Sequence, residues 1–286
     1  MRALLRRLLH LDRRATFVIV AVAVVAPFLA PFGLPVRPTD PVRQAFAAVD
    51  SLRGGGKPML LSYDFEPGAE AELGPAARAI LAHAFSNGTP VVVVNFMPAG
   101  LGLAENDLEA VAARYGKVNG RDYVFLGYNP SVLNSLLMIG KEIRDAFPTD
   151  SGGTPVDEIP LMRGIHSYDD FGLVVDLSSS YQPDYFVRYA VGRFGARLVI
   201  GATAVLASDY YPYLHAGQSE GLIGGMKGAA EYEQLLVDAG ILAGLAEGGQ
   251  GMDSQSAAHV AIVALIVLGN LAYLLGGRGR RAGRGA

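Results

Sequence analysis

The sequence predicts an α/β fold, a single Rossmann-like domain with a mostly parallel sheet, flanked by one N-terminal and one C-terminal transmembrane helix. Three observations predict it. Short apolar runs alternate with amphipathic segments through the middle of the chain, an apolar run lies near each end, and arginines flank both runs on their outer sides. Strand–helix alternation at this spacing is typical of right-handed βαβ units, which place helices on both faces of a parallel sheet.

The N-terminal part divides into a basic tail at residues 1–14 and an apolar run at 15–34 that carries no charged side chain. About 20 residues of helix cross a hydrocarbon core of about 30 Å, so this run is long enough to be transmembrane helix 1. A cleavable signal peptide has a similar beginning. The length of the run and the absence of a clear cleavage site after it favour an uncleaved anchor.

Residues 35–57 form a proline-rich linker and a short helix at 42–49, which Pro41 opens and the glycines at 54–56 follow. The α/β domain is expected at 58–240. Its apolar runs predict strands, and the amphipathic segments between them predict helices. The expected strands are 58–65, 90–96, 123–126, 172–177, 197–201 and a short last one at 221–224. The expected helices are 69–87, 105–115, 129–147, 183–194, a segment ending near 216, and 229–238.

A Gly-rich tether at residues 241–256 leads to the second apolar run at 257–275, transmembrane helix 2, and a basic tail at 276–286. Residues 1–15 and 277–286 each carry a net charge of +4, and the whole chain carries −3, which leaves −11 between them. Basic flanks stay cytoplasmic. The sequence therefore predicts a two-pass protein of the plasma membrane with both termini cytoplasmic and an acidic extracytoplasmic domain.

The acidic domain disfavours nucleic acid as a partner, because a phosphate backbone requires a basic surface. The chain has no cysteine, which excludes disulfides, thiolate catalysis and cysteine-ligated metal sites. The five histidines show no metal-ligand spacing, so no metal site is predicted from them. Neither glycine cluster, at 54–56 or at 221–228, has the spacing and the place of a phosphate-binding loop.

Polar side chains follow the predicted strands, and ligands of open parallel sheets bind beyond the carboxyl ends of strands. The ligand-binding candidates are therefore Asp64, Asn95, Asn129, Asp176 and Ser178. If the first and fourth strands are neighbours, Asp64, Asp176 and Ser178 flank one crevice. Carboxylates and hydroxyls there can hold a divalent cation or a polyol, although no cofactor is identified. The same residue types also cap helices and form turns, which is the alternative interpretation.

The catalytic candidates are Asp64, Asp176, Ser178 and His166, which lies near two aspartates, but no GxSxG motif accompanies them. Tyrosines 210, 211 and 213 form a candidate partner surface, since tyrosine favours interfaces. Ordinary half-buried packing explains them equally well.

The sequence favours a non-enzymatic role: a ligand-sensing or assembly subunit of an envelope membrane complex, with the lipid bilayer, a membrane-protein partner or a second copy as partners. The alternative is a membrane-anchored hydrolase or transferase that uses carboxylates at the strand carboxyl ends. A solute receptor is disfavoured, because such receptors close two lobes around a ligand and one lobe is expected here.

Overall fold

In the computed structural model, the structure describes residues 12–243 and 247–281, with side chains as far as residue 274. The expected basic tails therefore lie largely outside the described residues. The chain divides into two compact units. Residues 35–249 form an α/β domain, and residues 1–34 and 250–286 form a terminal unit. Each unit is described by itself.

The domain is built on one six-stranded sheet in which every pair of neighbouring strands is parallel. The strand order is β3-β2-β1-β4-β5-β6, so β1 and β4 lie together at the centre. This confirms the predicted α/β domain with a parallel sheet, and the expected strand at 221–224 is present. The strands are β1 (Met59–Asp64), β2 (Val91–Asn95), β3 (Tyr123–Tyr128), β4 (Leu173–Ser178), β5 (Leu198–Ala202) and β6 (Gly221–Gly224).

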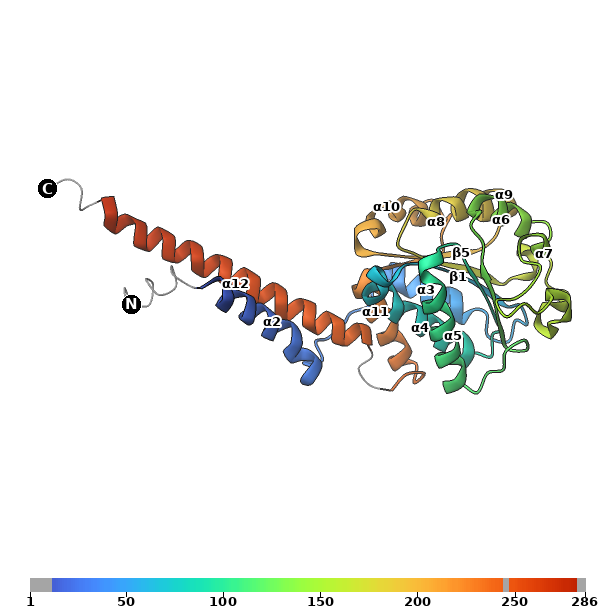
Figure 1. The fold of residues 1–286 in the computed structure, drawn as a ribbon, viewed down its shortest axis with the longest axis horizontal. Helices are drawn as coiled ribbons and strands as arrows, with labels where there is room; N and C mark the ends of the chain where they lie inside the picture. The colour runs from blue at the N-terminus through green and yellow to red at the C-terminus, as the bar shows by residue number, and fades with distance from the viewer. Residues whose placement is uncertain (1–11, 244–246, 282–286) are drawn as a thin grey trace. The chain divides into compact units, whose positions relative to one another are not determined.

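Helices cover both faces of the sheet, and each face has its own apolar layer. One layer is formed by α3 (Asp40–Asp50), α4 (Glu70–Ser86), α5 (Leu101–Arg114) and α11 (Gly225–Asp238). The other is formed by α6 (Val132–Ile139), α7 (Ile143–Ala146), α8 (Gln182–Tyr185), the π-helical η6 (Phe186–Val191), α9 (Gly192–Phe194) and α10 (Ala204–His215) (Figure 1). Strands that are buried on both faces explain the unbroken apolar runs in the sequence.

Short 3₁₀ turns complete the domain. They are η1 (Pro67–Ala69), η2 (Pro98–Gly100), η3 (Val156–Glu158), η4 (Pro160–Gly164) and η5 (Tyr168–Asp170). The last three lie between α7 and β4, and they have little apolar periodicity that would have predicted them.

The predicted helix at 129–147 is divided in two. α6 ends at Gly140, where a side chain would collide with the ring of Phe194, only 2.2 Å from a Cβ atom built at that position. α7 then begins with Glu142 as its N-cap, whose side chain accepts a hydrogen bond from the N–H of Arg144. The interruption therefore results from tight packing against η6 and α9. These elements are distant in the sequence, so the local helical pattern does not predict the interruption.

The terminal unit contains α2 (Arg13–Leu29) and most of α12 (Glu247–Arg281). Among the described residues, one helix is long and apolar enough to cross a membrane, the part of α12 from Glu247 to Leu274. α12 begins inside the segment expected as a tether. Its first turn is held within the domain, because the carboxylate of Glu233 accepts hydrogen bonds from the N–H groups of Gly248 and Gly249. Such partners satisfy N–H groups that a helix start otherwise leaves free.

Candidate functional site

β1 and β4 are paired at the centre of the sheet, which brings two carboxyl groups together. Ser62 is opposite Asp176 and Asp64 is opposite Ser178 in the register of the two strands. Side chains two apart in a strand point to the same face. All four therefore face the layer that contains Leu60 and Val174, and all four are fully buried. We call these four side chains the central polar cluster.

Asp64 is well supplied with hydrogen-bond donors. Its carboxylate accepts a bond of 2.5 Å from the hydroxyl of Ser62 and one of 2.6 Å from the N–H of Phe96. Both carboxyl oxygens of Asp176, in contrast, are buried without a donor among the described residues. Two ionised carboxylates side by side in an apolar layer would be strongly unfavourable, because no cation of the described part of the chain lies beside either of them.

A proton resolves this arrangement. Burial raises the pKa of the Asp64 carboxyl to about 7. Burial and the neighbouring Asp64 charge raise the pKa of Asp176 well above its ordinary range. We therefore assign the proton to Asp176, which donates it to Asp64. Because the donors of Ser62 and Phe96 stabilise a charge on Asp64 only, the two carboxyl groups differ in role.

The central polar cluster is enclosed. Each of its side chains has an exposed fraction of 0%. An acid–base pair or a ligand site must reach its substrate, whereas these groups bond to one another, to a backbone N–H and, through Ser178, to Gln182 at 2.9 Å. The geometry therefore provides an enclosed polar core rather than an open crevice, and within it the oxygens of Asp176 receive no hydrogen bond from the described residues.

Asn95 and Asn129 do not join the cluster. Asn95 ends β2 and its amide oxygen accepts from the N–H of Met97 at 3.0 Å. The amide oxygen of Asn129 accepts from the N–H of Ser131 at 2.9 Å. Both are bonds to a backbone group two residues onward, the pattern by which asparagine forms turns. For these two positions the structure matches the alternative interpretation of the sequence.

His166 and Ser178 lie at opposite ends of β4, since His166 precedes Leu173 and Ser178 is the last residue of the strand. Five residues of strand between Leu173 and Ser178 span about 16 Å. A serine–histidine–aspartate triad is thus not assembled from these residues.

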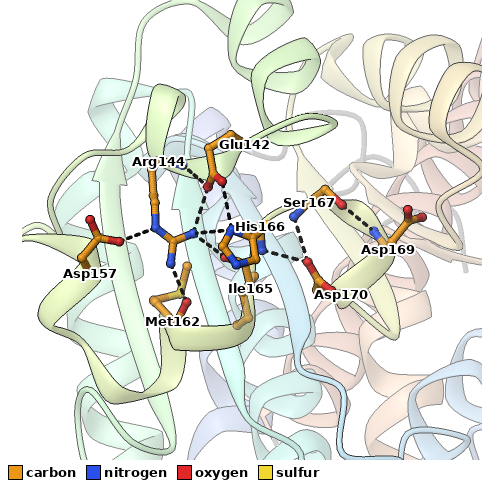
Figure 2. A network of polar contacts seen from close by, with 9 residues as sticks. All are labelled: Glu142, Arg144, Asp157, Met162, Ile165, His166, Ser167, Asp169 and Asp170. Carbon is orange, nitrogen blue, oxygen red and sulfur yellow. Dashed lines mark hydrogen bonds and ion pairs between the residues drawn. The ribbon is translucent and has the colours of Figure 1, made fainter.

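His166 belongs instead to an ion-pair network that the sequence does not suggest (Figure 2). Its centre is the guanidinium of Arg144, which donates to Asp157 at 2.5 Å, to Glu142 at 2.9 Å and to two backbone carbonyls. His166 contacts the other carboxylate oxygen of Glu142 at 2.9 Å. Arg144 and His166 lower the pKa of Glu142 to about 2. This network holds the segment of short 3₁₀ turns in place, which indicates a structural role.

The strand order is the one that dinucleotide-binding domains share. The connection between the first strand and the next helix, however, lacks the features of a nucleotide-binding site. Residues 64–72 carry four carboxylates, Asp64, Glu66, Glu70 and Glu72, and no basic residue. The N–H of Ala204, at the start of α10, is occupied by the Glu72 carboxylate at 2.8 Å. Nucleotide-binding sites offer free N–H groups to the phosphate. In this domain a phosphate would instead be repelled by carboxylates.

The three tyrosines of the candidate partner surface have different surroundings. Tyr210 is 1% exposed and donates to the carbonyl of Ser180, so it belongs to the core. Tyr213 is partly buried and donates to Asp184 at 2.5 Å. Tyr211 is 43% exposed and is the member of the three that remains available to a partner.

Two hollows of the domain surface lie at the amino ends of the strands, away from the central polar cluster. One, of about 440 Å³, is lined by residues of α3 and by Arg197, Ser219 and Glu220. The other, of about 290 Å³, includes Pro58, Pro90 and Asp170. Within the described part of the chain, no group of three or more histidine or acidic side chains is placed to hold a metal ion.

No protein-family model, curated protein or solved structure matches this chain.

Proposed function

We propose that the chain is a membrane-anchored, non-enzymatic subunit whose α/β domain lies outside the cytoplasm and serves assembly or ligand sensing in an envelope membrane complex. The observation that carries the proposal is the enclosure of the central polar cluster. The carboxyl groups that an anchored hydrolase or transferase would use have no exposed surface. The apolar stretch of α12 supports the anchorage.

The two-pass arrangement is part of the same proposal. α2 is a 17-residue helix without charge between Ala15 and Leu29, and arginines precede it. Arginines also follow the apolar part of α12. Basic residues on the outer side of both segments favour cytoplasmic termini, which leaves the domain on the other side of the membrane.

The test is purification of the full chain from its native membrane in a mild detergent, followed by native mass spectrometry. Companion proteins at fixed stoichiometry are the expected result, and their identities would name the process. A lone monomer or a homo-oligomer would contradict the assembly role. Replacing both Asp64 and Asp176 with asparagine is the matched control, since a non-enzymatic subunit should retain its companions when these carboxylates are absent and the fold is intact.

A further inference from the structure

The short linker that follows α2 has an unusual hydrogen-bond arrangement. Between Pro31 and Pro35, which have no N–H group, the chain has three backbone donors, on Phe32, Gly33 and Leu34. All three donate to one carboxylate, that of Asp253 in the second turn of α12, at 2.8, 2.8 and 3.2 Å. Residues about 220 positions apart are thereby joined within the terminal unit.

The linker has the backbone shape of an anion-binding nest. Gly33 has a φ angle of +62°, and nothing lies within 4 Å of a Cβ atom built there, so the angle rather than space requires glycine. A residue of positive φ between ordinary ones turns successive N–H groups toward one point, where they hold an anion. Asp253 fills this nest and is 1% exposed.

The faces of the two helices agree with this junction. Along α2, the side chains with reduced exposure lie on one stripe of the helix, and they are Ala15, Thr16, Val20, Ala23, Ala26 and Pro27. Along α12 the corresponding stripe is Ser254, Ala258, Ala261, Leu265 and Ala272. Small residues let membrane helices approach closely, and α2 is drawn alongside α12 in Figure 1.

We infer that Asp253 is a clasp that joins the outer ends of the two apolar segments, so that the chain enters the bilayer as one antiparallel hairpin. Unpaired N–H groups at the edge of the hydrocarbon are costly, and a buried carboxylate is costly without donors. The clasp satisfies both at once. The inference depends on the proposed membrane anchorage and adds the residue that pairs the two segments.

The experiment uses the full chain in native membranes. Because the chain has no cysteine, Phe32→Cys and Ser256→Cys introduce the only two thiols, and a short bismaleimide reports how often the segments meet. Replacing Asp253 with alanine should lower the initial rate of cross-linking about tenfold, because three charge-assisted hydrogen bonds are lost. Asp253→Asn, of equal size but uncharged, should give an intermediate rate.

Ser254→Ala is the matched control. Ser254 neighbours Asp253, is 6% exposed, and its hydroxyl bonds to none of the described residues, so the cross-linking rate should stay at the parent value. Gly33→Ala tests the nest and should lower the rate with Asp253 still present. Unchanged rates in the Asp253 variants would overturn the clasp.

Alkaline extraction separates this outcome from failure of the anchorage. A chain that is released from the membrane contradicts the proposed function and the clasp together. A chain that stays in the membrane, and whose parent thiol pair does not cross-link, contradicts the clasp alone.

Discussion

Asp176 places a carboxyl group in a fully apolar layer, and its role follows from what surrounds it. The residue opposite it is Ser62, whose hydroxyl is already given to Asp64. The remaining partner is the carboxylate of Asp64. A hydrogen bond from a protonated Asp176 to this carboxylate is more favourable than two negative charges side by side. At the residue scale, the central polar cluster therefore contains a proton that the carboxyl groups of two neighbouring strands share.

The shared proton predicts a dependence of stability on pH. Both carboxyl pKa values lie above the ordinary value of 3.8 in the folded chain, with Asp64 at about 7. The contribution of Asp64 to stability is therefore complete below about pH 4 and is lost as the pH rises through 7, and the contribution of Asp176 begins to be lost over the same range. The free energy of unfolding in detergent, measured by urea denaturation and far-UV circular dichroism, should fall over this range by an amount on the order of 3 kcal/mol.

Asp176→Asn tests the assignment of the proton. The carboxamide keeps the shape and can donate to Asp64, as the protonated carboxyl does, but it cannot ionise. The variant should match the parent at about pH 4 and exceed its free energy of unfolding at pH 8, because only the parent then loses stability as the pH rises. Asp238→Asn, at an exposed carboxylate of α11, should leave the pH profile unchanged. A parent-like slope in Asp176→Asn would refute the shared proton.

The sequence indicates this pair of residues but not its chemistry. Asp64 and Asp176 come together only if the first and fourth strands are neighbours, an order that the sequence leaves open. The apolar layer on their face of the sheet includes Phe96 and Phe186 of η6, which come from distant parts of the chain. Burial is a property of the assembled layer, so an open ligand site and a closed polar core have the same sequence pattern.

At the scale of elements, the contact of α3 with β6 sets a strict limit on side-chain size. A Cβ atom at Gly221 would lie 2.4 Å from the backbone of Ala45, which cannot move away as a flexible side chain can. The glycine is needed here because helix and strand approach each other closely.

Replacement of glycine by alanine should have opposite effects on the stability of the domain at two positions. Gly221→Ala should destabilise the domain by about 3 kcal/mol through overpacking. Gly102→Ala, in α5 with nothing within 4 Å of the new Cβ atom, should stabilise it by up to about 1 kcal/mol. Urea denaturation measures both. Equal effects of the two variants would contradict the proposed contact of α3 with β6.

The sequence predicts most elements because their signals are local. The six strands follow from apolar runs, and the helices between them from amphipathic segments. The interruption at Gly140 and the turns of residues 156–170 are set by Phe194 and by the Arg144 network. Such contacts join residues that are far apart in sequence, which a local pattern does not record.

At the scale of the whole molecule, the segregation of charge predicts the topology. A reporter that is active in the cytoplasm should be active when fused after Ala286. A reporter that is active only outside should be active when inserted in residues 149–154, an exposed loop of the domain. The basic ends are expected to stay inside because transfer of arginine across the membrane is unfavourable. The reverse pattern of reporter activity would refute the orientation.

The central pairing of β1 with β4 also has a consequence for the order of events during synthesis. β1 ends at Asp64 and β4 begins at Leu173, so more than a hundred residues must emerge before the middle of the sheet can close. Until then, β1, β2 and β3 form a half-sheet with an open edge on β1. Open edges invite pairing with other chains, and long-range parallel pairing is slow. Throughout this interval, pairing of that edge with other chains competes with the arrival of β4.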